Sequence, residues 1–463
     1  MFKNGVFISS SQFIVSYINW LLIYSLNVII PEYLFYNNQV YINGGLKKLK
    51  YFDTYKGLPK SIYIIFLAQV TNRFGDFVLP FLTLFLVKKM GLNYESAGFA
   101  LMLTSLASIP GSFAGGKIAD HFGRVKSYAV FQMTAGIFLF LCVFISNPHI
   151  IITLVCLSSF FNGGVRPIMS AIITDVLPAK KRQIGFSISY LGINLGAAVG
   201  PLAAGFLFDN YIPLIFIGDA ITSLIAVILV VLYIKETLPE YDDSNCIRNE
   251  ERSEDGNVFT VLLKRPKILI FLIINIFLSF TYTQNVFSLP IMLDNIFGGS
   301  GASNYGIIIS FNAITVLVMT MFITNKIRKW HPLSAIAFSG ILYAIGFGMI
   351  TFIHSMSFFI LSTLIWTIGE IIIVTNFGVY IANNTPQNFR ARFSAVASLS
   401  FAIGAALGTS LLGQYMDVLG VKAVWPLVFF LALFGSAGMY VLKIKTEKSK
   451  ETIKSTNNLS HDI

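Results

Sequence analysis

Residues 212–234 read IPLIFIGDAITSLIAVILVVLYI, and Asp219 is the only charged residue among them. A hydrocarbon core about 30 Å thick is crossed by roughly 20 apolar residues in an α-helix, so this stretch is long enough to span a membrane. Similar runs recur along the chain between short polar breaks. Across the sequence 55% of residues are apolar and 12% are charged, which leaves too little polar surface to cover a water-soluble globule. We therefore expect the chain to lie in lipid.

Lipid also restricts the secondary structure, because backbone polar groups inside a bilayer must be satisfied by helices or by a closed barrel. The apolar runs are too long for barrel strands. We predict an all-α integral membrane protein with two bundles of six helices. The predicted spans are 61–88, 96–115, 127–147, 150–177, 183–207, 212–234, 268–292, 304–324, 333–353, 356–384, 393–416 and 423–443. The expected divisions are an extension at 1–60, a bundle at 61–234, a cytoplasmic linker at 235–267, a bundle at 268–443 and a cytoplasmic tail at 444–463.

The predicted extension contains a further uncharged run at residues 7–30. It is long enough to form an extra transmembrane helix, and it lacks the cleavage signature of a secretory signal. An interfacial helix, or a translation start assigned too far upstream, explains the run equally well.

Lys and Arg residues concentrate in alternate breaks between the predicted spans. Basic residues favour the cytoplasmic side of a membrane, so we place these breaks and both ends of the core inside the cell. The cytoplasmic breaks hold Lys117, Arg124, Lys126, Lys180, Lys181, Arg182, Lys326, Arg328, Lys329, Arg390 and Arg392, whereas the opposite breaks hold Lys88, Lys89 and Lys422. The net charge of +11 thus reflects membrane topology and does not indicate nucleic-acid binding.

Two stretches of the sequence resemble each other at a separation of 208 positions. The matched pairs are Pro178 with Pro386, Arg182 with Arg390, Gly196 with Gly404, Ala197 with Ala405, Ala198 with Ala406, Gly200 with Gly408, Gly205 with Gly413 and Asp209 with Asp417. Small residues four apart let helices approach closely, so helix packing explains the individual glycines. The whole set predicts two repeated halves with a cavity between them at mid-membrane depth.

The stretch 116–126, GKIADHFGRVK, resembles the signature loop that the major facilitator superfamily carries between its second and third spans. Its glycines suit a tight turn with close helix contact, its aspartate suits a neighbouring helix N-terminus, and its basic residues anchor the cytoplasmic side. The resemblance extends over about residues 61–443. It implies a transporter that works by alternating access, with a cytoplasmic gate motif formed by Gly116, Asp120, Gly123, Arg124 and Lys126.

Residues 192–205 are similar to the Gly-Pro motif in the fifth span of proton-coupled drug antiporters of the same superfamily. The spacing of the glycines predicts a pliant, closely packed helix. The stretch 185–196, GFSISYLGINLG, is also similar to the fifth span of proton-coupled peptide symporters, although the acidic residues that those symporters place before the arginine are missing before Arg73. These similarities do not decide between export and uptake as the direction of transport. The Gly-Pro motif consists of Gly192, Gly196, Gly200, Pro201 and Gly205.

Four ionisable residues in the spans are candidates for transport and proton coupling, because charges inside a membrane are costly. Arg73 and Asp76 are three positions apart and either form a static ion pair or take part in coupling. Arg166 lies in the fourth span. The family resemblance implies that this span lines the cavity and that an arginine in it takes part in proton coupling. Glu370 lies near the middle of the tenth span, where it either takes part in transport or pairs with another helix without a transport role. We predict an Arg166–Glu370 pair across the two halves, which protonation or solute binding would weaken.

Further polar and aromatic residues are candidates for the substrate cavity. Trp366 lies one helical turn before Glu370, and an acid beside an aromatic ring suits a cationic or amphipathic solute. Side chains that can hydrogen-bond a solute are Tyr282, Gln284, Asn285 and Asn376. Hydrogen bonds between helices explain these four equally well. Asp175 and Asp219 are weaker candidates, because both are expected near span ends, where water can solvate them.

No catalytic or metal site is predicted. All five histidines fall in polar breaks or the tail, no HExxH pair occurs, and the three cysteines have no paired spacing. The stretch 111–117 matches the opening of a phosphate-binding loop, but Ile118 stands where Ser or Thr is required. We therefore expect no cofactor, and a membrane-embedded enzyme or channel is disfavoured.

The expected function is secondary active transport of a small solute across the cytoplasmic membrane by a monomeric chain. The Gly200-Pro201 motif and the face shared by Trp366 and Glu370 favour proton-coupled efflux of drugs or other amphipathic compounds. Proton-coupled uptake of a peptide or another small metabolite is the alternative.

Overall fold

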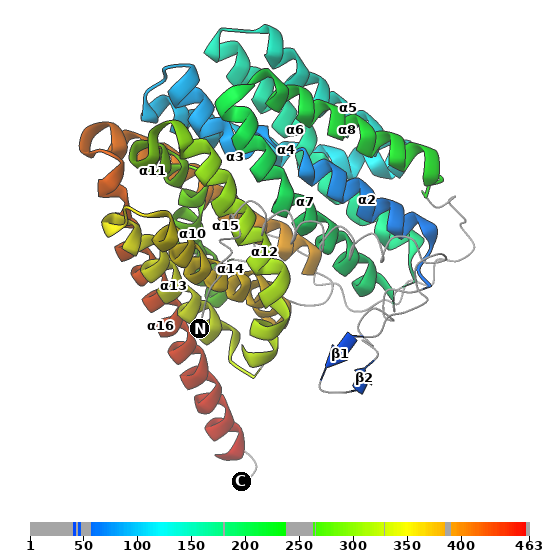
Figure 1. Cartoon of the computed structure of the whole chain (residues 1–463). Helices are drawn as coiled ribbons and strands as arrows, with labels where there is room; N and C mark the ends of the chain where they lie inside the picture. Colours follow the sequence, from blue (N-terminus) through cyan, green and yellow to red (C-terminus); the bar gives the residue numbers. More distant parts are fainter. Residues whose placement is uncertain are drawn as a thin grey trace.

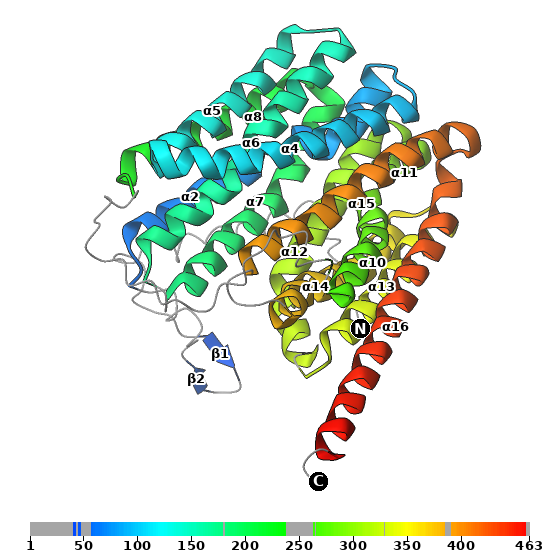
Figure 2. The same cartoon turned by 180° about the vertical axis from the view of Figure 1, so that it is seen from behind.

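Figure 1 shows the computed structural model, in which residues 40–42, 45–47, 57–178, 181–237, 263, 265–327, 329–384 and 390–459 are described. The run at 7–30 and most of the predicted linker lie outside the described residues. The described helices form two bundles, one from each half of the chain, and Figure 2 shows the same bundles from behind.

The first bundle contains α2 to α8. Its first span is interrupted at Gly75, and a π-helical turn at Phe85–Lys89 follows the short helix α3. Asn93 begins α4, because its side chain accepts a hydrogen bond from the N–H of Ser96 and so satisfies one free donor of the helix end. The bounds are α2 (Lys60–Phe74), α3 (Val78–Leu84), α4 (Tyr94–Phe122), α5 (Arg124–Leu141), α6 (Pro148–Val176), α7 (Arg182–Asn210) and α8 (Pro213–Tyr233).

The second bundle repeats this plan. Its first span is broken at a 3-10 turn that begins at Thr283, 208 positions after the break at Gly75. The last helix continues to Leu459, beyond the span predicted at 423–443. The bounds are α10 (Pro266–Tyr282), α11 (Ser288–Phe297), α12 (Gly301–Ile327), α13 (Pro332–Gly348), α14 (Met356–Asn384), α15 (Arg390–Leu419) and α16 (Val424–Leu459). Ahead of both bundles, β1 (Val40–Ile42) pairs antiparallel with β2 (Gly45–Lys47).

Eleven helical stretches of the described residues are long and apolar enough to cross a membrane. The longest, Pro266–Ile327, has 62 residues and contains α10, α11 and α12. At about 1.5 Å per residue it is much longer than one crossing requires, and α12 packs back against α11, so this stretch crosses twice. The predicted all-α membrane architecture, with six spans in each half, is confirmed.

Glycines of α7 allow this helix to pack closely on α2. A Cβ atom on Gly196 would lie 2.5 Å from the carbonyl oxygen of Val70, so any larger residue would push the helices apart. Gly404, the repeat partner of Gly196, meets the carbonyl oxygen of Ile276 on α10 in the same manner, at 2.6 Å. The equivalent contacts one turn to either side on α7 are Gly192 with Phe66 and Gly200 with Phe74. The prediction that the repeated glycines mediate helix packing is confirmed.

Candidate functional site

Hydrogen bonds and an ion pair join the two bundles at the end of the molecule that carries α3 and α11, which we call the closed end. Lys88 Nζ lies 2.5 Å from Asp294 Oδ1. Asp417, near the end of α15, accepts hydrogen bonds from the backbone N–H groups of Tyr94 (3.0 Å) and Glu95 (2.8 Å) at the start of α4. A carboxylate suits a helix N-terminus because of the free N–H groups and the helix dipole. The ribbons meet at this end and diverge toward the other, which we call the open end (Figure 2).

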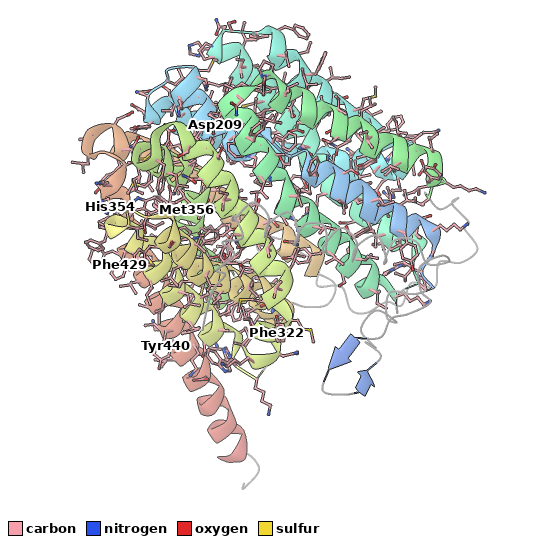
Figure 3. The ribbon with its side chains drawn as sticks, in the orientation of Figure 1. Asp209, Phe322, His354, Met356, Phe429 and Tyr440 are labelled. Carbon is pink, nitrogen blue, oxygen red and sulfur yellow. The ribbon has the colours of Figure 1, made fainter. Side chains whose placement is uncertain are left out.

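The contact of Asp417 has a counterpart 208 positions earlier in the chain. Asp209, near the end of α7, accepts a 2.7 Å hydrogen bond from the hydroxyl of Ser303 in the first turn of α12, and Figure 3 shows Asp209 at the closed end. Ser303 and Glu95 are also 208 positions apart. The glycines four residues before the two aspartates make matching contacts, which are Gly205 on Ala302 and Ser303, and Gly413 on Tyr94 and Glu95. We call the contacts of Asp209 and Asp417 the closed-end latches.

Aromatic side chains pack between the bundles at the same end. Phe81 on α3 lies edge-on to Tyr305 on α12, with ring centroids 5.2 Å apart, and its centroid is 5.8 Å from that of Phe208 on α7. All three side chains are fully buried. Thr83 donates a 3.1 Å hydrogen bond to the carbonyl oxygen of Val286 across the interface. These buried side chains fill the space between the bundles at this level.

A cavity of about 1000 Å³ lies between the bundles, beside the middle of α4 and α6, and we call it the central cavity. Residues of α2, α3, α4 and α6 form most of its wall, and α15 of the second bundle supplies the rest. The described lining combines hydroxyl and amide groups with apolar side chains, and it holds two arginines but no aspartate or glutamate. Its polar residues include Arg73, Ser105, Asn162, Arg166, Ser170 and Ser398.

The break between α2 and α3 gathers three of the ionisable residues. Arg73 Nη1 lies 2.6 Å from Asp76 Oδ2, so this predicted ion pair is formed. Asp219 on α8 accepts a 3.4 Å hydrogen bond from the N–H of Val78, the first residue of α3. Its side chain is buried, and the expectation that water solvates it near a span end is wrong, because it satisfies the N-terminus of a half-helix inside the bundle. Gly75 is needed here, since a Cβ atom would overlap Thr222 of α8.

Arg166 and Glu370 do not form the predicted ion pair in this conformation. Both carboxylate oxygens of Glu370 accept hydrogen bonds within the second bundle, one from the Tyr282 hydroxyl (2.8 Å) and one from the Asn312 amide (2.7 Å). Arg166 lines the central cavity on α6. Tyr190 on α7 lies within electrostatic reach of both charges. The sequence analysis missed Asn312 and Tyr190, although a polar residue in the middle of an apolar run is a signal for the first.

Trp366 does not line the central cavity, which corrects the prediction. It is fully buried inside the second bundle, stacked on Phe347 with a centroid distance of 5.4 Å and edge-on to Tyr282 at 6.2 Å. The physical reason is close packing of α13 on α14, where a Cβ atom on Gly346 would lie 2.9 Å from the backbone nitrogen of Trp366.

The remaining candidates for the cavity make hydrogen bonds inside their own bundle. The Gln284 amide donates to the carbonyl oxygen of Gly408 at 3.3 Å and accepts from the Ser288 hydroxyl at 2.7 Å. Asn285 is buried, and Asn376 donates to a carbonyl of its own helix. The described lining of the central cavity contains none of them. Interhelical and local hydrogen bonding explains Gln284 and Asn376 in this conformation, whereas the buried Oδ1 of Asn285 has no hydrogen-bond partner among the described residues.

The predicted gate motif lies at the open end and bonds within the first bundle. Arg124 forms ion pairs with Asp120 and with Asp175, the latter at 3.2 Å. Gly123 makes the turn into α5 with a φ of +104°, a conformation that favours glycine. Glu236, which follows α8, accepts from the backbone N–H groups of Arg124 (2.5 Å), Val125 (3.3 Å) and Lys126 (3.5 Å), so it satisfies the N-terminus of α5. The sequence analysis placed Glu236 in the linker and gave it no role.

Neither the backbone conformation nor helix packing requires a glycine at position 116. Gly116 lies inside α4, and a Cβ atom there would meet open space, so the prediction that it permits close helix contact is wrong. Among the described residues no group of three or more His, Cys, Asp or Glu side chains is arranged to hold a metal ion.

The sequence matches the family model described as Major Facilitator Superfamily over residues 65–409. A "Na(+), Li(+), K(+)/H(+) antiporter" of Planococcus maritimus is 25% identical over 352 residues, which cover 71% of this chain and 82% of that protein. The class H tetracycline resistance protein of Pasteurella multocida is 26% identical over 211 residues, which cover 45% of this chain and 52% of that protein. A crystal structure of a POT peptide transporter in complex with sulfate aligns with a TM-score of 0.67 at 18% identity, over 84% of this chain and 96% of that one. The last likeness concerns the fold alone.

Proposed function

Because the chain belongs to the major facilitator superfamily, and is therefore a multi-pass membrane transporter and not an enzyme, we propose that it exports amphipathic compounds in exchange for protons. The chain acts as a monomer in the cytoplasmic membrane and exposes its cavity to one side at a time. The observation that carries this proposal is the central cavity between two bundles that are latched at one end.

Basic residues assign the sides of the membrane. The open end carries Lys117, Arg124, Lys126, Arg182 and Lys326, whereas the closed end carries Lys88, Lys89 and Lys422. From the positive-inside rule we infer that the open end faces the cytoplasm. In this orientation the central cavity accepts a solute from inside the cell, as export requires.

Glu370 is the carboxylate that we assign to proton exchange. As an anion it accepts the hydrogen bonds of Tyr282 and Asn312 with both oxygens. Protonation removes a negative charge that acts on Tyr190 of α7, as the charge of Arg166 also does, and it leaves a carboxyl group that needs only one of the two donors. Closing the open end would bring Arg166 toward the second bundle, where an ionised Glu370 can receive it. Proton loss and cavity closure are thereby linked.

The similarity to a Na(+), Li(+), K(+)/H(+) antiporter supports exchange against protons, and the similarity to a tetracycline resistance protein supports export. Both relatives share about a quarter of their aligned residues with this chain, so the transported compound is argued below from the cavity itself.

The test uses the full chain in proteoliposomes with an imposed pH gradient and a fluorescent amphipathic dye. We expect dye movement against proton flow, and we expect Glu370→Gln to retain dye binding but lose gradient-driven transport. Glu447→Gln is the matched control, because Glu447 pairs with Lys443 on α16, away from the cavity. Full coupling in Glu370→Gln, or movement of a dipeptide together with protons, would contradict the proposal, and the second result would indicate uptake.

A further inference from the structure

The central cavity carries an unbalanced positive charge. Arg73 and Arg166 are the charged residues of its described lining. Arg73 shares its charge with Asp76 at 2.6 Å, and its side chain remains 42% exposed. None of the ion pairs found within the described part of the chain includes Arg166. One guanidinium group is thus left to face the cavity at the middle of α6.

A charge at this depth is costly unless it meets a partner or lines a water-filled space. A guanidinium group presents a planar fork of N–H donors that matches the two oxygens of a carboxylate. It is therefore suited to bind an anion that enters from the open end.

The surroundings of Arg166 suit the rest of an amphipathic acid. Ser170, one turn further along α6, donates its hydroxyl to the Arg166 carbonyl at 2.9 Å, and its oxygen can still accept a hydrogen bond from a solute. Asn162 supplies an amide one turn in the other direction. On α4 and α15 the wall combines hydroxyl groups with apolar side chains, and the apolar Ile109, Phe113 and Leu399 can cover a hydrocarbon or ring.

A cationic solute finds no comparable partner in this cavity. Glu370 is outside the described lining, and both of its oxygens already accept hydrogen bonds from Tyr282 and Asn312. Trp366, the aromatic ring expected to attract a cation, is buried inside the second bundle.

We propose that the central cavity binds amphipathic organic acids, with the carboxylate held by Arg166 and the apolar part against α4 and α15. This inference deepens the proposed export function and rests on it only for the transport step. Binding to the cavity is a separate property and is measured without a gradient.

The experiment compares 1-naphthaleneacetate with 1-naphthylmethylammonium, which share a ring system and carry opposite charges. Binding to the purified full chain in detergent is measured by isothermal titration calorimetry. We expect the acid to bind at least 10-fold more tightly than the amine. Loss of a hydrogen-bonded charge pair corresponds to about a 10- to 100-fold loss of affinity, so Arg166→Gln should abolish this preference and leave binding of the amine unchanged. Arg166→Lys should restore part of it.

Arg265→Gln is the control, because Arg265 donates to the carbonyl oxygen of Asn384 away from the cavity. Each variant is compared with the parent in melting temperature, so a folding defect is separated from a loss of binding. The inference would be overturned if the amine bound at least as tightly as the acid, or if neither compound bound. An unchanged preference for the acid in Arg166→Gln would also overturn it. If the acid preference is present but a pH gradient moves neither compound in proteoliposomes, the proposed function fails while the inference holds.

Discussion

Removal of the two closed-end latches should shift the protein toward a conformation in which the closed end is open. Asp417→Ala removes the acceptor of two backbone N–H groups at the start of α4, those of Tyr94 and Glu95. Asp209→Ala removes the acceptor of the Ser303 hydroxyl. The two aspartates act on different helix pairs, α15 with α4 and α7 with α12, so their effects should add.

The expected change in free energy between the two conformations follows from the exposure of these contacts. A hydrogen bond to a charged group contributes about 1.5–3 kcal/mol when it is shielded. Asp417 is exposed, and water can replace the lost acceptor, so the helix-cap value of about 1 kcal/mol is the better measure. A similar contribution from Asp209 gives about 2 kcal/mol for the double variant, which corresponds to about a 30-fold change in the equilibrium between conformations.

Spin labels at positions 211 and 352 report this change by pulsed electron double resonance. Tyr211 and Phe352 are 57% and 82% exposed and lie on opposite bundles at the closed end. The three cysteines of the chain are replaced by alanine first. We expect the double variant to gain a population at longer distance. Asp175→Ala removes a carboxylate at the open end and should leave the distances unchanged. Identical distributions in the parent and the double variant would refute the assigned role of the latches.

Three further predictions follow from packing inside the bundles. Gly196→Val should lower the melting temperature by several degrees, because the side chain would overlap the carbonyl of Val70, whereas Gly116→Val should not, because it faces open space. Asp219→Leu should destabilise the chain by about 1–2 kcal/mol in thermal unfolding, since it removes the acceptor at the start of α3, and Asp219→Asn should retain most of this stability. Trp366→Phe should lower the melting temperature but leave the affinity for 1-naphthaleneacetate unchanged, because the indole is buried away from the cavity.

The fold could be predicted from the sequence because its determinants are local and repeated. Each apolar run satisfies its own backbone as a helix, and membrane thickness sets the length of the run. The separation of 208 positions was also informative, since Gly196 and Gly404 meet carbonyl groups of equivalent helices. The β1–β2 hairpin was not predicted, because its short strands lie in a segment without a strong hydrophobic pattern.

Predictions for the site were less successful where they depended on the direction of side chains. Trp366 and Glu370 are four positions apart and both contact Tyr282 on α10, but the indole also stacks on α13 while the carboxylate also meets α12. Spacing on one helix does not reveal which neighbour each face meets. The predicted pairing of Arg166 with Glu370 would depend in addition on how far the two bundles approach each other, and the sequence alone does not indicate which conformation the structure adopts.

The two ends of the molecule differ in a manner that bears on the transport cycle. At the closed end the repeat supplies a latch from each half. At the open end the ion pairs of Asp120, Arg124 and Asp175 belong to the first half, and Glu236 completes the cluster. The positions 208 residues later are Arg328, Pro332, Asn383 and Ile444, which contain no acid.

Closing the open end therefore costs two latches, and the contacts of the gate motif do not offset this loss because they are already formed in the present conformation. The free energy needed to close the open end must come from a ligand that binds the closed cavity more tightly than the open one. A solute held by Arg166 on α6 and covered by Leu399 on α15 contacts both bundles, so its binding energy can favour their approach at the open end. An acid that reaches only the first bundle should bind without driving transport, and acids with an apolar part of increasing length should show increasing transport rates at equal occupancy.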